Sequence, residues 1–145
     1  MTKIFVKNIK NKFDQKKAFE IRNKVFCEEQ KVSKIIEFDG MDKFSNHYLA
    51  KFNEFPVGTA RVREKKKGIY KIERMAVLKK YRMEGVGKAI IKKILDQYII
   101  IGKNNNLILN SQIKAKDFYK KFGFVEVGKE FTEANIKHIK MIYKC

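Results

Sequence analysis

Residues 74–88 read RMAVLKKYRMEGVGK, and this stretch carries the strongest signal for the fold. Its apolar beginning is typical of a strand, its basic middle is typical of a turn, and Gly85 and Gly87 then open a helix. Glycines let a ligand approach the backbone closely, and the first N–H groups of a helix have no intrahelical acceptor. The stretch therefore predicts a phosphate or pyrophosphate site, to which the neighbouring lysines and arginine add positive charge.

Two common phosphate motifs are absent from this stretch. The dinucleotide fingerprint Gly-x-Gly-x-x-Gly would need a glycine where Ile90 stands. A P-loop would need a hydroxyl residue after Lys88 and a further glycine upstream. On this window alone, a helix that merely starts on glycines is the alternative interpretation.

The flanking sequence predicts a mixed α/β (α+β) fold. On the N-terminal side we expect a strand over 3–9, a helix from a capping Asp14 to about Glu29, a loop or irregular helix over 31–45, and strands over 47–52, 57–63 and 69–78. On the C-terminal side we expect a helix over 85–101 with Gly102 as its C-cap, a strand over 107–109, a short helix over 115–122, and strands over 124–127 and 136–143. The order β-α-β-β-β-α-β-α-β-β contains a right-handed β-α-β unit around residues 69–111.

Composition indicates a single domain that spans residues 1–145. The hydrophobic fraction of 44% supplies a core, and the chain has one proline and no linker-like segment. No apolar run approaches the roughly 18 residues of a membrane span, and the N-terminus has no signal-peptide pattern, so we expect a cytoplasmic protein without a membrane partner. The two cysteines and two histidines favour neither a disulfide framework nor a metal site.

The formal charge of +18 permits a second interpretation, a basic nucleic-acid-binding module. The basic residues are 29 Lys and 5 Arg, a bias that an A+T-rich genome imposes through its codons. Proteins that read nucleic-acid grooves favour Arg, and we find no zinc finger, helix-turn-helix or RNP-like strand. A solvated lysine surface is therefore the preferred explanation, and we do not expect a nucleic-acid partner.

Two motifs identify a family resemblance. Residues 82–87, RMEGVG, resemble the cofactor motif Arg/Gln-x-x-Gly-x-Gly/Ala of the GNAT superfamily of N-acetyltransferases, and residues 115–124, AKDFYKKFGF, resemble its second signature. Residues 22–32, RNKVFCEEQKV, and 109–112, LNSQ, are similar to the ElaA-like branch. The resemblance covers about residues 3–143. It implies a GNAT fold, in which a mostly antiparallel central sheet contains a β-α-β unit that binds acetyl-CoA.

The resemblance implies an acyltransferase that moves acetyl from acetyl-CoA directly to a primary amine, without a metal. Tyr119 would protonate the departing thiolate, because a phenol has a proton to give and can lie about 100° round the helix from core-facing Phe118 and Phe122. Glu73 would act as base if its pKa is raised, and His47 is the alternative base. The structural alternatives are a core tyrosine, a glutamate in an ion pair and a buried histidine.

The resemblance also implies two sets of binding residues. Residues that would hold acetyl-CoA are Met75, Ala76, Val77, Arg82, Met83, Glu84, Gly85, Val86, Gly87, Lys88, Asn110, Gln112, Phe118 and Tyr119. Residues that would line the acceptor site are Phe26, Glu29, Gln30, Asp39 and His47. Cys27 has no base beside it in sequence, so we interpret it as a packing residue.

Glu73 leaves the acceptor open. Many ElaA-like sequences have glycine at this position, whereas the amino-sugar-phosphate acetyltransferases of the superfamily have glutamate. An amino-sugar phosphate such as glucosamine 6-phosphate is therefore one candidate, beside polyamines, arylamines and protein lysines. A GNAT-fold protein that binds CoA without catalysis and a homodimer are two further alternatives.

Overall fold

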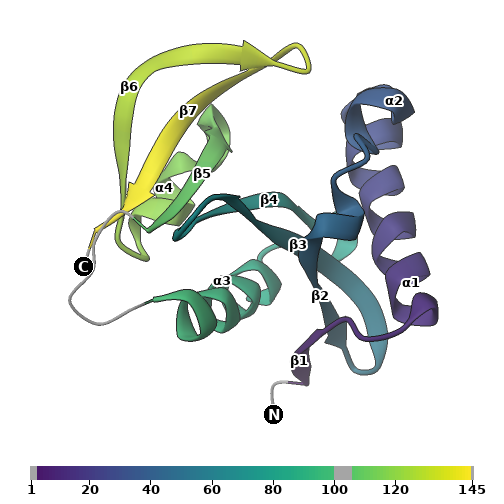
Figure 1. Ribbon diagram of the computed structural model, residues 1–145. Helices are drawn as coiled ribbons and strands as arrows, with labels where there is room; N and C mark the ends of the chain where they lie inside the picture. The colour runs from purple at the N-terminus through teal and green to yellow at the C-terminus, as the bar shows by residue number, and fades with distance from the viewer. Residues whose placement is uncertain (1–2, 100–105, 145) are drawn as a thin grey trace.

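The computed structural model describes residues 3–99 and 106–144, which form a seven-stranded sheet of order β1-β2-β3-β4-β5-β7-β6 (Figure 1). The strands are β1 (Ile4–Asn8), β2 (Ser45–Phe52), β3 (Phe55–Lys66), β4 (Ile69–Val77), β5 (Leu107–Gln112), β6 (Phe124–Glu133) and β7 (Ile136–Tyr143). The α-helices are α1 (Lys12–Arg22), α2 (Lys34–Glu37), α3 (Val86–Tyr98) and α4 (Lys116–Lys120). All neighbouring strands are antiparallel except β4 and β5, which α3 connects. The expected fold class is therefore confirmed.

The sheet has two faces, which we call the α1 face and the α3 face after the helices that cover them. Tyr48 and Ala50 of β2 belong to the apolar cluster under α3, while Leu49 between them belongs to the cluster under α1. This alternation follows from the two-residue period of a strand. A Cβ atom on Gly58 would lie 2.8 Å from the Val86 side chain, so a glycine is required where α3 packs on β3.

The parallel pairing of β4 with β5 is short. It joins Tyr70, Lys71 and Ile72 to residues 107–109 and then stops, although β4 runs on to Val77 and β5 to Gln112. Beyond Ile72, the backbone edge of β4 on this side therefore has no strand partner within residues 3–99 and 106–144. A β-bulge lies in the same segment, where Arg74 has a φ of 58°. The bulge lets Glu73 and Arg74 both face the α1 face.

Several expected boundaries are corrected by the structure. The first helix is capped by Asn11 and not by Asp14, because the Asn11 side chain accepts the Asp14 backbone N–H at 2.8 Å. That helix continues as a π-helix, η1, over Asn23–Glu29. The irregular segment 31–45 contains α2 and the 3-10 turn η2 (Asp42–Phe44).

The other differences lie at element ends. Strands β3, β5 and β6 are longer than expected, because pairing in the sheet continues past their apolar residues. Helix α3 ends at Tyr98, and the expected C-cap Gly102 lies outside the described residues. In the part of the chain that the structure describes, no helix is both long and apolar enough to span a bilayer.

Candidate active site

The predicted phosphate site lies at the start of α3. Met83 and Gly85 both have left-handed backbone conformations, with φ of 70° and 90°, and this turn ends the 3-10 segment that follows β4. The first helical hydrogen bond runs from the Ala89 N–H to the Gly85 carbonyl at 3.0 Å. The N–H groups of Val86 and Gly87 therefore have no acceptor within the helix, as an anion site requires.

Gly87 brings the two sequence signatures into contact. A Cβ atom at this position would lie 3.2 Å from the Phe118 ring, which comes from α4. A larger residue at position 87 would therefore have to displace that ring. Close packing between α3 and α4 sets the position of the neighbouring Tyr119.

Tyr119 is 7% exposed and belongs to the α3-face core, whereas Phe118 and Phe122 are only partly buried. The expected arrangement, with the two phenylalanines in the core and Tyr119 turned away, is therefore wrong. The helix spans only five residues and follows a 3-10 turn, so ideal helical angles do not carry over from one side chain to the next. No hydrogen bond joins the Tyr119 hydroxyl to another side chain of residues 3–99 and 106–144. Burial raises the pKa of the phenol, so it keeps its proton at neutral pH.

Arg82 is held by Glu29. Its Nη1 and Nη2 atoms donate to the two carboxylate oxygens at 2.7 and 2.8 Å, and its Nε donates to the Val77 carbonyl at 2.9 Å. The hydrogen bonds from Arg82 hold the pKa of Glu29 below its ordinary value. Glu29, expected at the acceptor site, thus contacts the loop expected to bind the cofactor.

Beyond Ile72 and Leu109 the strands β4 and β5 are no longer paired, and we call the gap between them the β4–β5 opening. Gln30 contacts β5, on the side of this opening opposite to Arg82. Its side-chain oxygen accepts the Gln112 amide at 2.9 Å, so consecutive residues at the end of η1 touch the loop before α3 and the end of β5. A cavity of about 430 Å³ lies at the second contact. Its lining residues are Glu29, Gln30, Gln112, Ile113, Lys114, Ile136 and Lys137.

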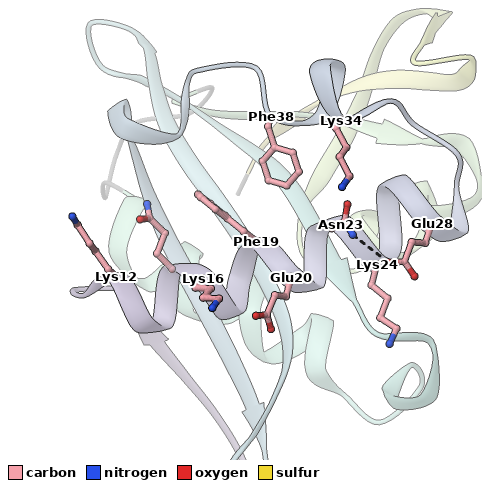
Figure 2. Close-up of a pocket in the computed structure, with 10 residues that line it drawn as sticks. Lys12, Lys16, Phe19, Glu20, Asn23, Lys24, Glu28, Lys34 and Phe38 are labelled. Carbon is pink, nitrogen blue, oxygen red and sulfur yellow. Dashed lines mark hydrogen bonds between the residues drawn. The ribbon is translucent and has the colours of Figure 1, made fainter.

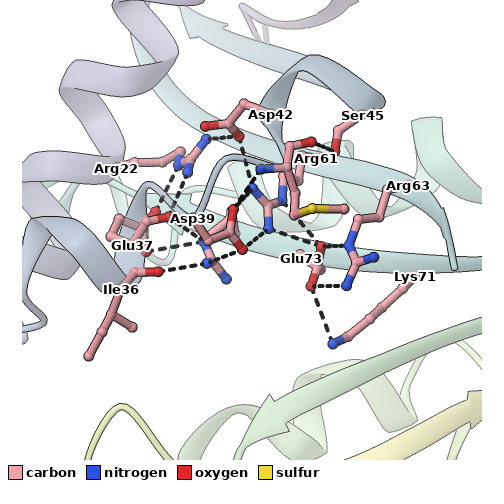
Figure 3. A network of polar contacts seen from close by, with 12 residues as sticks. Arg22, Ile36, Glu37, Asp39, Asp42, Ser45, Arg61, Arg63, Lys71 and Glu73 are labelled. Carbon is pink, nitrogen blue, oxygen red and sulfur yellow. Dashed lines mark hydrogen bonds and ion pairs between the residues drawn. The ribbon is translucent and has the colours of Figure 1, made fainter.

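The α1 face of β3 and β4 carries a network of ion pairs (Figure 3). Its centre is Arg61, which is 0% exposed and contacts Asp39 and Asp42, both at 2.9 Å, and Glu73 at 3.1 Å. Asp39 also contacts Arg74 at 3.2 Å, and the hydrogen bond from Arg61 lowers its pKa strongly. Asp39 is therefore already paired with two guanidinium groups and is not a free carboxylate for a cationic amine.

Glu73 contacts three cations: Arg63 at 2.6 Å, Arg61 at 3.1 Å and Lys71 at 3.2 Å. Burial raises the pKa of Glu73, but the hydrogen bond from Arg63 and the surrounding charges outweigh it and leave the pKa below its ordinary value. The raised pKa expected from the sequence is therefore wrong. This environment favours the ion-pair interpretation of Glu73 over proton acceptance.

His47 and Phe26 are packing residues in the structure. His47 is 7% exposed, lies edge-on to the Phe19 ring, and its Nε2 is 2.9 Å from the Asp42 carbonyl oxygen. Burial lowers the pKa of His47, so the ring is neutral and donates to that carbonyl. Phe26 packs against the cluster under α1, and neither residue lines the cavity beside Gln30. Cys27 is a half-buried free thiol whose pKa burial raises, as suits a packing residue.

The remaining predicted site residues lie along the open edge and the loop. Met75, Ala76 and Val77 follow the last residue of β4 that pairs with β5, and Asn110 holds the same place on β5. Met83, Glu84 and Lys88 are exposed around the helix start. In residues 3–99 and 106–144 no group of three His, Cys, Asp or Glu side chains is placed to hold a metal ion.

Sequence reasoning missed the arginine network. Arg22 is 1% exposed and contacts Glu37 and Asp42, both at 2.7 Å, and Arg74 contacts Glu37 at 3.2 Å. A signal was present: all five arginines of this lysine-rich chain make ion pairs. In a chain with 29 lysines, an arginine indicates a position where a planar guanidinium group, which can donate several hydrogen bonds to carboxylates, is required.

A larger hollow of about 630 Å³ lies along α1 (Figure 2). Phe19 and Phe38 form its apolar part, and Lys12, Lys16 and Lys34 are among its charged residues. None of the site residues expected from the sequence lines it. The β4–β5 opening is therefore the better candidate for the active site.

Comparisons with known proteins agree with this geometry. The family model for the acetyltransferase (GNAT) domain matches residues 10–145. The "uncharacterized N-acetyltransferase YjcF" of Bacillus subtilis (strain 168) is 42% identical over 134 residues, which are 92% of this chain and 94% of that protein.

Solved structures show the same fold. ElaA of Escherichia coli superposes with a TM-score of 0.82 and 24% identity, over 99% of this chain and 100% of that chain. A GNAT family acetyltransferase from Elizabethkingia anophelis, solved with acetyl-CoA bound, gives a TM-score of 0.68 and 17% identity over 97% of this chain and 95% of that chain. The chain therefore belongs to the GNAT acetyltransferase family, and it is an acyltransferase.

Proposed function

We propose that the chain transfers the acetyl group of acetyl-CoA to a small primary amine by direct attack. The observation that carries the proposal is the opening between β4 and β5, where pairing stops after Ile72. Helix α3, which starts at Val86, packs against β4, and α4, which carries Tyr119, packs against β5. The Tyr119 hydroxyl makes no side-chain hydrogen bond within residues 3–99 and 106–144.

These residues fit acetyl-CoA, which supplies an activated acetyl thioester. The N–H groups of Val86 and Gly87 suit its pyrophosphate, and the partnerless edge of β4 at residues 75–77 suits the amides of its pantetheine arm. The Asn110 amide lies at the matching place on β5. Most of these donors are backbone N–H groups, at the start of α3 and along the edge of β4, so they do not depend on particular side chains.

Tyr119 holds the proton that the reaction requires at sulfur. As the amine nitrogen bonds to the acetyl carbon and the carbon–sulfur bond breaks, the phenol gives its proton to the departing thiolate. The proton lost by the amine passes to solvent, and the Tyr119 phenolate takes up a proton from solvent before the next turnover. Glu73 is a positioning residue in this scheme, because its carboxylate is engaged by Arg61, Arg63 and Lys71.

An amino-sugar phosphate, for example glucosamine 6-phosphate, is the acceptor we favour within this class. Its support is the glutamate at position 73 together with the cations around it, Arg63 and Lys71. A phosphate carries the opposite charge to this surface.

Thiol release from acetyl-CoA, measured against a panel of primary amines, tests the proposed function. We expect release with at least one small amine, and none with that amine when Gly87→Glu places bulk and negative charge at the helix start. A panel without release, from a folded protein that still binds CoA, would instead support a non-catalytic CoA-binding protein.

A further inference from the structure

Four cations lie on the α1 face of the sheet beyond Glu73. Arg63 and Lys65 come from β3, Lys71 from β4 and Lys140 from β7. Arg63 is opposite Lys71, and Lys140 is opposite Asn110 in the register. The strand neighbours of Arg63, Lys71 and Lys140 are buried in the α3-face core, namely Val62, Ile72, Ile139 and Met141. Lys65 lies at a register shift between Glu64 and Lys66, and the positive charges that act on it are those of Lys71, Lys140 and Arg63.

This group of cations is poorly compensated. Glu73 contacts Arg63 and Lys71, whereas Lys65 and Lys140 make no ion pair within residues 3–99 and 106–144. Elsewhere on the same face the charges balance, because Arg61 meets Asp39 and Asp42. Four positive charges thus share a single carboxylate.

The positive charges of these residues repel one another across the strands. The charge of Lys71, together with burial and the charges of Lys140 and Arg63, lowers the pKa of Lys65. A bound anion would relieve this repulsion.

The cations lie where they could bind the end of an acceptor that is opposite to its reacting amine. Lys71 and Glu73 are neighbours on one face of β4, and Met75 stands at the partnerless edge. Four residues of strand place Lys71 about 13 Å before Met75. An amine held near the edge can therefore carry its anionic group toward these lysines.

We propose that Arg63, Lys65, Lys71 and Lys140 form an anion subsite that binds the phosphate group of the acceptor amine. The proposal rests on the proposed function for the role of the amine, and it assigns the phosphate to named side chains. The subsite is separate from the start of α3, which is assigned to the cofactor's pyrophosphate.

The double variant Lys65→Gln/Lys140→Gln tests the subsite, because neither residue belongs to the ion-pair network. The matched control Lys16→Gln/Lys92→Gln removes the same charge from exposed positions on α1 and α3. Two acceptor pairs are compared: glucosamine 6-phosphate with glucosamine, and 2-aminoethyl phosphate with 2-aminoethanol. We expect the double variant to lose at least about tenfold in kcat/KM for the phosphorylated member of each pair, through KM.

The unphosphorylated members and the KM for acetyl-CoA should be unchanged in the double variant, and the control should behave as wild type. Equal losses for phosphorylated and unphosphorylated acceptors would overturn the subsite. A raised KM for acetyl-CoA would also overturn it, since the lysines would then serve the phosphates of CoA.

Binding of glucose 6-phosphate, which has no amine, separates this proposal from the proposed function. Calorimetry should show a Kd at least about tenfold higher in the double variant than in wild type and in the control. This result would support the subsite even if no amine were acetylated. Absence of binding to the wild type, or equal binding to all three proteins, would refute it.

Discussion

The two faces of β3 and β4 are held in place by different physical interactions. On the α3 face, Val62 and Ile72 pack among the apolar side chains of α3. On the α1 face, Arg61 and Glu73 stand at the same level of the sheet and are held by ion pairs. One pair of strands therefore carries a hydrophobic core on one side and a buried network of charges on the other.

The two faces should therefore tolerate substitutions to different degrees. An apolar core accepts a similar side chain at modest cost, because its contacts are not directional. A buried charge needs its partner, because the charge that remains has no water to replace the lost contact. We therefore expect the α1 face to be the more sensitive one, although it contributes less apolar burial.

Replacing Arg61 should have the largest effect on stability. Arg61→Ala leaves Asp39, Asp42 and Glu73 without their shared partner, and we expect the free energy of unfolding to fall by about 3–5 kcal/mol. A conservative change on the α3 face, Ile90→Val, which replaces one apolar side chain by a similar one, should cost about 0.5–1.5 kcal/mol. Urea denaturation of both variants measures the contrast. Equal losses would mean that the two faces do not differ as described.

Tyr119→Phe should have the next largest effect, and it should appear in catalysis and not in stability. The hydroxyl makes no side-chain hydrogen bond in the described residues, so the α3-face core should be unchanged. Loss of proton delivery should lower kcat by about 100- to 1,000-fold, or about 2.7–4 kcal/mol in the barrier.

Stopped-flow or steady-state kinetics with acetyl-CoA and with an acyl donor whose leaving group needs no proton would sharpen this result. The loss should shrink with the second donor. An equal loss with both donors would assign Tyr119 to positioning, and no loss would make it a core residue only.

Glu73→Gln should destabilise the protein by about 1.5–3 kcal/mol at neutral pH, because Arg61, Arg63 and Lys71 lose a charged partner. The pKa of Glu73 lies below its ordinary value of 4.5, so its stabilisation is complete above that pH and is lost as the pH falls through the lowered pKa. Thermal melts from pH 3 to 7 should show a shallower acid dependence for the variant. If the acidic limb of the pH–rate profile disappears instead, Glu73 is the base.

Arg82→Lys should have the smallest effect. Its pair with Glu29 is partly exposed, and such pairs contribute about 0.2–1 kcal/mol. The bidentate fork also fixes the end of η1, so we expect a change of a few fold in the KM for the acceptor with little change in thermal stability. A large loss of stability would show that this contact belongs with the buried network.

The fold was largely predictable because its signals are local. The glycines at 85 and 87, the helical period expected over 85–101 and the strand expected over 47–52 each depend on neighbouring residues, and the structure confirms a helix and a strand there. The choice of Asn11 over Asp14 as the cap was not predictable, since both side chains cap helices well.

The α1 face was not predictable for a different reason. Arg82 and Glu29 are 53 positions apart, and Arg74 and Glu37 are 37 apart. The contact of Arg74 with Glu37 involves the bulged residue of β4, and no local sequence pattern predicts that bulge. The environment of Glu73, and with it the direction of its pKa shift, follows from the register of β3 on β4, which places Arg61, Arg63 and Lys71 around its carboxylate.

The short parallel pairing between β4 and β5 has a consequence for hydrogen–deuterium exchange. In the part of the chain that the structure describes, no strand carbonyl lies across the opening from the amides beyond Ile72 and Leu109, so these amides should exchange within the dead time of a manual experiment. The paired amides of residues 70–72 and 107–109 should retain hydrogen far longer. Occupation of the opening would convert fast amides of residues 73–77 into slow ones, so deuterium uptake along β4 would trace the ligand's path residue by residue.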